Sequence, residues 1–163
     1  MAHVHLRVLF PRNRNRTGVL RVEQDGRIIA EFAALGRGNR GQGDTSLLNE
    51  GNTPTGIYTA TGLESAAGRD LKKYGPWGAV RLKPVGGQAL LAERIGHRSG
   101  LLIHGGSLGS TGYWRGEGAL RATHGCIRLS NEDIRRLKQI FEDASLGKDK
   151  CAAPTVTVSV EEH

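Results

Sequence analysis

Aromatic residues, cysteine and long apolar runs are all scarce in this chain. Phe, Tyr and Trp together make up 5% of the sequence, and the two cysteines are Cys126 and Cys151. So few aromatic rings argue against a protein that stacks nucleic-acid bases. Two cysteines do not form a disulfide framework. No stretch approaches the roughly 18 apolar residues of a membrane helix, so we expect no membrane insertion.

Glycine and positive charge are abundant instead. The chain has 24 glycines in 163 residues, a net charge of +7 and a pI near 9.9. A chain of this length is expected to form one domain, residues 1–163, with a core of its own. Many glycines indicate turns and close backbone approaches rather than a helix bundle. The basic charge suits an acidic partner such as nucleic acid, anionic lipid or a cell-wall polymer.

The first half of the chain predicts β-structure. Residues 4–10 alternate apolar and polar side chains, as a half-buried strand does. Two further apolar segments flank Asp25-Gly26, which is the sequence of a type I′ hairpin turn. Trp77 to Leu82 indicates a strand stopped by Pro84, and Ala89 to Ala92 indicates another short strand. The alternating residues 155–160 predict the last strand.

One convincing helix follows residue 130. Ser130 is expected to be its N-cap, with acidic residues in the first turn. An apolar face then recurs at helical spacing, formed by Ile134, Leu137, Ile140 and Phe141. A second, short helix is expected within 65–74. We expect the basic side chains Arg135, Arg136 and Lys138 to lie on a solvated surface. The fold class is therefore mostly β, a β-rich α+β arrangement with one main helix.

The chemistry is concentrated between residues 103 and 130. An apolar run ends at His104, a glycine-rich loop follows, and Cys126 stands shortly before the helix. Free cysteine is mostly protonated at neutral pH, so a nucleophilic thiol needs a base such as histidine nearby. The two residues are 22 positions apart (126 − 104), so only the fold can bring them together.

Residue patterns alone leave other interpretations open. A cysteine beside a helix is often an inert core residue. A His-x-Cys pair with a third histidine is also compatible with zinc, although no second cysteine pair supports it. The segment Gly36–Gly41 resembles a phosphate-binding loop, but no helix pattern follows it. A non-catalytic wall-binding module and a basic nucleic-acid-binding protein remain as non-enzymatic alternatives.

Two segments together resemble a known family. His104-Gly105, followed after a spacer by residues 123–129, Thr-His-Gly-Cys-Ile-Arg-Leu, resembles the signature of the L,D-transpeptidase (YkuD-like) catalytic domain. Thr53-Pro54-Thr55-Gly56 resembles the Thr-Pro-x-Gly element that precedes a strand bordering the active site of that family. Gly96-His97-Arg98-Ser99-Gly100 resembles a Gly-Arg-Ser-Gly segment of one branch, with His97 as an insertion. The resemblance implies a compact β-sandwich or barrel.

The resemblance also implies roles for individual residues. Cys126 is the expected nucleophile and His104 its base, with the carbonyl of Gly105 orienting the ring. His124 is expected to shape or tune the turn. The remaining expected oxyanion and substrate-binding residues are Thr123, Gly125 and Arg128, the last because its guanidinium suits a substrate carboxylate. No metal or cofactor is implied, and Cys151 matches nothing in the signature.

The implied reaction is acyl transfer on peptidoglycan stem peptides. Cys126 would form a thioester and release the terminal D-alanine, and an amine would resolve the thioester. Water as acceptor would make the domain an L,D-carboxypeptidase or endopeptidase, and a D-amino acid would make it an exchange enzyme. The place of action would be the cell envelope or periplasm. From the N-terminal residues we expect no signal peptide within this sequence, so an export signal would lie outside these residues or export would follow another route. Export by a dedicated secretion system, as for antibacterial toxins with an immunity partner, is therefore a further alternative.

Overall fold

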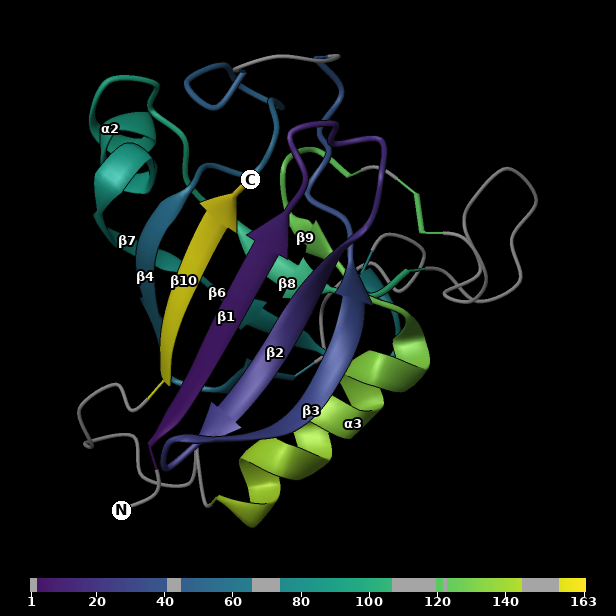
Figure 1. The fold of residues 1–163 in the computed structure, drawn as a ribbon. Helices are drawn as coiled ribbons and strands as arrows, with labels where there is room; N and C mark the ends of the chain where they lie inside the picture. Colours follow the sequence, from purple (N-terminus) through teal and green to yellow (C-terminus); the bar gives the residue numbers. More distant parts are fainter. Residues whose placement is uncertain (1–2, 41–44, 66–73, 107–119, 122, 145–155) are drawn as a thin grey trace.

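The computed structural model describes residues 3–40, 45–65, 74–106, 120–121, 123–144 and 156–163. Strands predominate, as the sequence predicts (Figure 1). They are β1 (Val4–Phe10), β2 (Gly18–Gln24), β3 (Arg27–Ala34), β4 (Gly56–Ala60), β5 (Leu63–Glu64), β6 (Ala79–Arg81), β7 (Lys83–Gly86), β8 (Leu102–His104), β9 (Ile127–Arg128) and β10 (Val156–Glu162). The described helices are α2 (Gly87–Arg94) and α3 (Asn131–Asp143).

The strands form two mixed sheets. The larger has the order β3-β2-β1-β10-β4-β7, in which β1 and β10 are parallel and the other described neighbours are antiparallel. The smaller has the order β5-β6-β8-β9, with β8 and β9 parallel. An isolated bridge between Leu35 and Arg128 joins the end of β3 to β9. The sheet that carries the functional residues is thereby fixed to the larger one.

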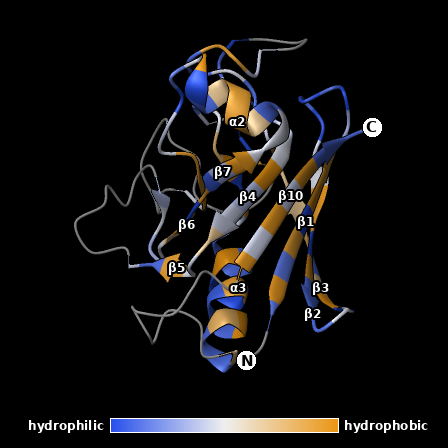
Figure 2. Ribbon diagram, turned by 90° about the vertical axis from the view of Figure 1, so that its left-hand side faces the viewer, coloured by the Kyte–Doolittle hydropathy of each residue, from blue (hydrophilic) through white to orange (hydrophobic). Residues whose placement is uncertain are grey.

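The core lies between the larger sheet and α3 (Figures 1 and 2). Alternate residues of β1 are fully buried, as the pattern of the first strand predicts. The four apolar residues predicted for the helix face, Ile134, Leu137, Ile140 and Phe141, are all buried against them. Burying one such side chain contributes about 1.5–3 kcal/mol. The helix is thus held by its packing, and its N-terminus is placed at the edge of the smaller sheet.

Two local predictions are confirmed by backbone geometry. Asp25 and Gly26 have φ values of +51° and +81° and connect β2 to β3, as a type I′ turn requires. Ser130 caps α3, because its hydroxyl oxygen accepts a hydrogen bond of 3.1 Å from the N–H of Asp133. Both features are encoded by a few adjacent residues, so neighbouring sequence is sufficient to predict them.

The segment after Trp77 differs from the prediction. Residues 89–92, expected to form a strand, lie within α2. Ala and Leu are strong helix formers, and a four-residue apolar run does not distinguish helix from strand. Pro84 does not end the strand region but lies within β7, at the edge of the larger sheet. A proline is tolerated at an edge, where its missing N–H removes no ladder bond. Most of the helix expected within 65–74 lies outside the described residues.

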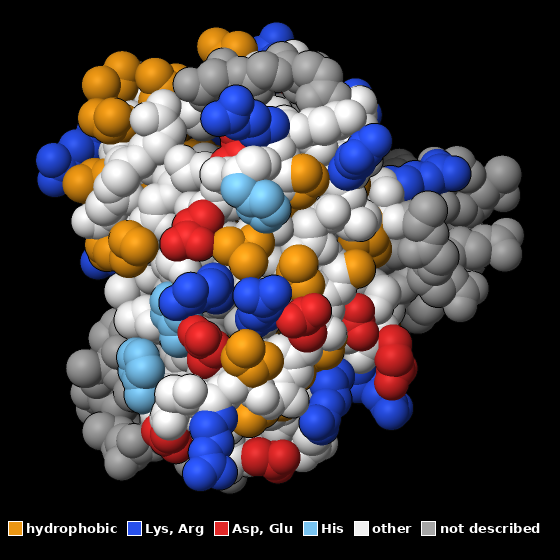
Figure 3. All heavy atoms as spheres, in the orientation of Figure 1, with side chains coloured by type: hydrophobic (Ala, Val, Ile, Leu, Met, Phe, Trp, Pro, Cys, Tyr) orange, Lys and Arg blue, Asp and Glu red, His pale blue; other side chains and the backbone are white. Residues whose placement is uncertain are grey.

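Positive charge is not segregated on the outer face of the larger sheet. Figure 3 shows basic and acidic side chains intermixed over this face. Two cross-strand ion pairs contribute to the mixture, Arg21 with Glu31 at 2.9 Å and Arg7 with Glu23 at 3.8 Å. The net charge of +7 therefore does not create a continuous basic surface here. Within the described residues, neither helix is long and apolar enough to cross a membrane.

Candidate active site

The smaller sheet has one core face and one face that carries polar side chains. Side chains of successive strand residues point to opposite faces. One set belongs to the hydrophobic core and consists of Leu101, Ile103, Ile127 and Leu129. The alternate set lies outside that cluster and consists of Leu102, His104, Cys126 and Arg128. The four core residues therefore fix which way the candidate catalytic residues face.

The parallel register of β8 and β9 brings His104 and Cys126 together. Ile103 pairs with Ile127 and His104 with Arg128, so Cys126 lies beside Leu102. The N–H of Leu102 donates to Sγ of Cys126 at 3.3 Å, which confirms this placement. His104 follows Leu102 by two residues on the same face, about 6.6 Å along the strand. Two residues that are far apart in the sequence are thus neighbours on one surface.

The ring of His104 is buried and held in one orientation. Only 3% of His104 is exposed, and its Nδ1 lies 2.6 Å from the carbonyl oxygen of Gly105. A carbonyl oxygen can only accept, so Nδ1 carries the proton and Nε2 is the nitrogen able to take another. The ring of Tyr74 packs edge-on against the imidazole, with 4.9 Å between centroids. The predicted orienting role of the Gly105 carbonyl agrees with this contact.

Arg128 contacts the same carbonyl oxygen. Its Nη1 donates to the oxygen of Gly105 at 2.9 Å, and its Nε donates to the carbonyl of Arg121 at 3.0 Å. Arg128 is 8% exposed, and this burial lowers its pKa to about 10, with the charge of Cys126 opposing the change. The guanidinium is therefore still a cation at neutral pH. It contacts the Gly105 carbonyl, which orients the ring of His104.

The loop after His104 is clamped by the first residue of α3. The side-chain amide of Asn131 accepts from the N–H of Gly106 and donates to its carbonyl, both at 2.9 Å. A Cβ atom on Gly105 would lie 2.0 Å from Oδ1 of Asn131, and one on Gly75 would lie 2.6 Å from it. These glycines are required because the amide occupies the space of a side chain. Sequence reasoning missed Asn131, which looks like an ordinary first-turn residue.

Thr123 shapes the turn that presents Cys126. Its hydroxyl donates to the carbonyl of Cys126 at 2.8 Å and accepts from the N–H of Gly125 at 3.0 Å. The N–H of Gly125 is therefore directed into the turn. Gly125 has a φ of +112°, which favours glycine. The oxyanion and substrate-binding roles expected for these residues remain predictions.

The Thr-Pro-x-Gly element meets this turn from the other side. Thr53 is fully buried, and its hydroxyl donates to the carbonyl of Gly125 at 2.7 Å. Arg14 secures the element with a hydrogen bond of 3.0 Å to the carbonyl of Thr53. Arg14 is itself neutralised by Glu162 at 2.8 Å. Two segments about 70 residues apart thus form one rigid unit behind the thiol, which is consistent with the expected position of the element beside the site.

His124 lies at the surface of the turn, whereas His104 is buried. The side chain of His124 is 68% exposed, and its Nδ1 lies 2.7 Å from a carboxylate oxygen of Glu50. The amide nitrogen of Asn39 is 3.3 Å from the same Nδ1 atom of His124. Within the described residues, no group of three or more His, Cys, Asp or Glu side chains is arranged to hold a metal ion. The placement of His124 agrees with a role in shaping the turn.

A hollow of about 240 Å³ lies beside the segment that contacts the thiol. Sγ of Cys126 is 3.9 Å from the carbonyl oxygen of Gly100, and Gly100 lines this hollow. The other lining residues include the basic side chains of Arg81 and Lys83 and the acidic side chain of Glu93. Arg81 is paired with Glu64 at 2.9 Å. Residues 107–119 and Cys151 lie outside the described residues. A hollow of about 240 Å³ can hold a short part of a peptide.

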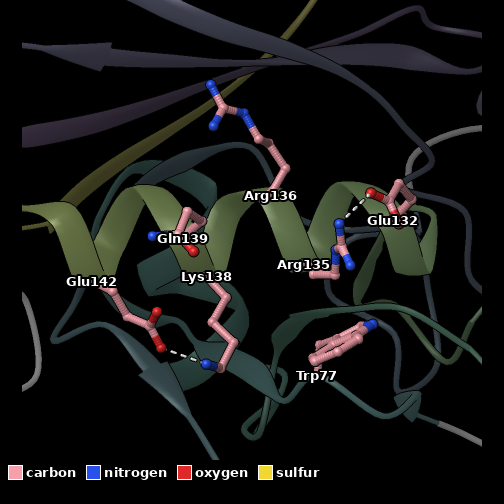
Figure 4. A pocket seen from close by; sticks show the side chains of 7 residues that line it. All are labelled: Trp77, Glu132, Arg135, Arg136, Lys138, Gln139 and Glu142. Carbon is pink, nitrogen blue, oxygen red and sulfur yellow. Dashed lines mark hydrogen bonds and ion pairs between the residues drawn. The ribbon is translucent and has the colours of Figure 1, made fainter.

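A second hollow, of about 430 Å³, lies along the outer side of α3 (Figure 4). Trp77 lines it, with the guanidinium of Arg135 5.9 Å from the indole centroid. Arg135 also pairs with Glu132 at 3.4 Å, and Lys138 pairs with Glu142. Figure 4 shows these pairs within the groove. Because two of its cations are paired with its own carboxylates, the groove does not present a purely basic surface to nucleic acid.

The family model described as the L,D-transpeptidase catalytic domain, YkuD, matches residues 12–156. The chain therefore belongs to the YkuD L,D-transpeptidase catalytic domain family, a family of peptidoglycan-modifying enzymes. No curated protein matches the sequence. The match spans both the Thr53 segment and the turn that carries Cys126.

Two solved structures are among those to which this chain is similar. One is Bd1075 of Bdellovibrio bacteriovorus, with 17% identity, a TM-score of 0.56, and coverage of 96% of this chain and 48% of that chain. The other is L,D-transpeptidase 1 of Mycobacterium tuberculosis, with 16% identity, a TM-score of 0.43, and coverage of 96% and 61%. The chain thus spans less than two thirds of either. The likeness to Bd1075 establishes the fold.

Proposed function

We propose that this domain is a cysteine acyltransferase that acts on peptidoglycan stem peptides. The observation that carries the proposal is the placement of Cys126 and His104 on one face of the β8–β9 pair. The buried ring of His104 has its tautomer fixed by Gly105. A thiol and an oriented base within reach of one substrate bond are the arrangement that covalent acyl transfer requires.

In the first half-reaction, Nε2 of His104 holds the proton that the Cys126 thiol has given up, and the thiolate Sγ attacks the carbonyl carbon that precedes the terminal D-alanine. A C–S bond forms, and the carbonyl electrons move to oxygen as an oxyanion. The oxyanion collapses, the C–N bond breaks, and His104 in its protonated form gives a proton to the departing amine. The products are a thioester on Cys126, free D-alanine and neutral His104.

In the second half-reaction, Nε2 of His104 takes a proton from the acceptor as the acceptor attacks the thioester. The C–S bond breaks and the sulfur leaves as thiolate. An amine of another stem gives a cross-link, a D-amino acid gives exchange, and water gives carboxypeptidase activity. These outcomes share one thioester, so the acceptor determines whether the domain builds, edits or trims the wall. Use as a secreted antibacterial toxin corresponds to the editing and trimming outcomes.

Cationic groups near the thiol support an anionic substrate. Lys83 lines the hollow beside Gly100, and the guanidinium of Arg128 lies on the same sheet face as the thiol. Arg81 also lines the hollow, but it is paired with Glu64 at 2.9 Å. Stem peptides carry free carboxylates, which guanidinium and ammonium groups bind. We assign this hollow to the stem peptide and keep the carboxylate-binding role of Arg128 as a prediction.

Mass spectrometry of muropeptides tests the proposal. Peptidoglycan or purified tetrapeptide stems are incubated with the protein and with its Cys126→Ala variant. We expect loss of terminal D-alanine only with the unaltered protein, accompanied by cross-linked, exchanged or shortened products according to the acceptor. An intact-mass shift equal to the acyl group should appear transiently on the protein. Identical product spectra for both proteins would contradict the proposal.

The place of action is tested separately. Mature stem peptides lie outside the cytoplasm, so expression with an added export signal should change cell shape or growth, whereas cytoplasmic expression should be tolerated. The Cys126→Ala variant with the same export signal is the control. Equal toxicity of the unaltered protein in both compartments would exclude the wall as its target.

A further inference from the structure

Arg98 is a buried cation without a carboxylate partner in the described part of the chain. It is 4% exposed, and every hydrogen bond of its guanidinium goes to a backbone carbonyl. Nη1 donates to Ser46 at 2.7 Å and Asn52 at 2.8 Å, and Nη2 donates to Gly51 at 3.0 Å. Carbonyl groups satisfy the donors but do not neutralise the charge. A buried charge without a counterion costs several kcal/mol of folding free energy.

The guanidinium of Arg98 lies directly beneath the turn that presents the thiol. A Cβ atom on Gly125 would lie 2.1 Å from Nη2 of Arg98, so this position admits only glycine. Cys126 is the next residue along the chain. Burial lowers the pKa of Arg98, and interactions with Tyr58 and Cys126 oppose the change. Attraction between two charges is mutual, so a cation here favours the thiolate over the thiol.

We propose that Arg98 is a positioning residue whose charge holds Cys126 as a thiolate and whose hydrogen bonds fix the turn around it. The proposal rests on the proposed function, in which Cys126 is the nucleophile. Arg98 then has two roles. Its hydrogen bonds fix the loop of residues 46–52, and its charge prepares the sulfur for attack. The thiolate in turn supplies the counterion that the buried guanidinium lacks.

The other charged and titratable groups around the thiol are compatible with this role. Arg128 from β9 adds a second buried cation, and His104 from β8 contributes a ring whose Nδ1 is held by a carbonyl. Tyr58 from β4 donates its hydroxyl to the carbonyl of Pro54, and burial raises its pKa, so the phenol stays neutral. On the outer side of the turn, His124 and Glu50 form one pair. The field at the sulfur is therefore dominated by cations.

Arg14 offers a matched control. It is 3% exposed and also donates to backbone carbonyls of the Thr53 segment, those of Gly36 and Thr53. Unlike Arg98, it forms an ion pair with Glu162, at 2.8 Å. Replacing Arg14 loosens the same side of the turn without removing a charge that faces the thiol. A change seen with Arg98 but not with Arg14 therefore reports on charge rather than on loop packing.

The test measures the rate of Cys126 alkylation by iodoacetamide as a function of pH, with Cys151→Ser as the background and peptide mass spectrometry as the readout. We expect the unaltered site to titrate below the free-cysteine value of about 8.5. Arg98→Met should raise the midpoint by about one pH unit or more. Arg98→Lys should restore part of the shift, and Arg14→Met should leave the midpoint unchanged.

Three outcomes would overturn the proposal. They are a midpoint at or above the free-cysteine value in the unaltered site, an unchanged midpoint in Arg98→Met, and an equal shift in Arg14→Met. The midpoint of the unaltered site remains decisive even if Arg98→Met does not fold.

The same measurements distinguish failure of this proposal from failure of the proposed function. A low, Arg98-dependent midpoint without any change in muropeptides contradicts only the function, whereas normal products with an unmoved midpoint contradict only the role of Arg98.

Discussion

Nδ1 of His104 and Nη1 of Arg128 contact one carbonyl oxygen, that of Gly105, at 2.6 and 2.9 Å. The two side chains face each other across the paired residues of β8 and β9. A carbonyl has two lone pairs, so it can accept from both. The guanidinium polarises and fixes the carbonyl, and the carbonyl fixes the imidazole. Arg128 therefore influences the orientation of His104 whether or not it also binds substrate.

The first prediction separates these two roles of Arg128. If it positions His104, Arg128→Lys should lower kcat by about 100-fold with little change in KM, because a displaced base affects only the chemical step. If it binds a substrate carboxylate, KM should rise instead. Steady-state kinetics with a tetrapeptide stem and with its carboxyl-amidated form distinguish the two. Equal loss on both substrates supports positioning, and a selective loss on the free carboxylate supports binding.

The second prediction concerns which histidine is the base. His104 is buried with a fixed tautomer, whereas His124 is exposed and paired with Glu50. His104→Ala should reduce thioester formation by about a hundred- to ten-thousand-fold, the usual effect of losing a general base. His124→Ala should slow it only moderately. Intact-mass measurement after mixing with a carbapenem or a stem peptide reports acylation. Rapid acylation of the His104 variant, with none in the His124 variant, would reverse the assignment.

The sequence was sufficient for features encoded by adjacent residues and for those that a family signature marks. The hairpin at Asp25-Gly26 and the cap at Ser130 belong to the first kind. The contact between the Thr53 element and the turn that carries Cys126 belongs to the second, because only the resemblance connected segments so far apart. Local patterns distinguished helix from strand best where the apolar residues repeated over a whole helix or strand.

The buried polar residues could not be predicted from local sequence. An arginine such as Arg98 is normally exposed, and its burial depends on carbonyls supplied by a loop some 50 residues earlier in the chain, at 46–52. Asn131 looks like a helix start, and its clamp on Gly106 exists only because two segments meet. The helix at residues 87–94 was missed because Ala and Leu fit both element types there.

A third prediction concerns the cysteines. Cys126→Ser should abolish acylation of residue 126 and turnover, because a serine hydroxyl has no comparable ionised form at neutral pH. Cys151→Ser should retain both. Alkylation followed by peptide mass spectrometry should show that activity loss tracks modification of Cys126 alone. Loss of turnover in a folded Cys151→Ser variant would contradict the assignment of a single essential thiol.

A fourth prediction is a pH dependence of stability from His5. The ring lies 2.7 Å from Oγ1 of Thr157 and 3.0 Å from Oγ of Ser159, and burial lowers its pKa below 6.5, with smaller and opposed effects of Glu23 and Arg7. The unfolded chain then binds more protons than the folded one, so stability is full above pH 6.5 and falls as pH decreases through the lowered pKa. Melting temperatures at about pH 7.5 and about pH 5 should differ more for the unaltered protein than for His5→Gln. An equal change in melting temperature between the two pH values for both proteins would contradict this prediction.

The last prediction compares two glycines with positive φ. Gly125 has a φ of +112° and no room for a Cβ atom, which would lie 2.1 Å from Arg98 and 2.6 Å from the carbonyl of Gly51. Gly26 has a φ of +81° and nothing within 4 Å of such an atom. Gly26→Ala should therefore cost only the backbone strain, about 1–2 kcal/mol, and should not affect acylation. Gly125→Ala combines strain with a steric clash, so we expect about 2–5 kcal/mol and loss of acylation. Urea unfolding gives both costs, and similar values for the two variants would show that the turn yields without displacing Arg98.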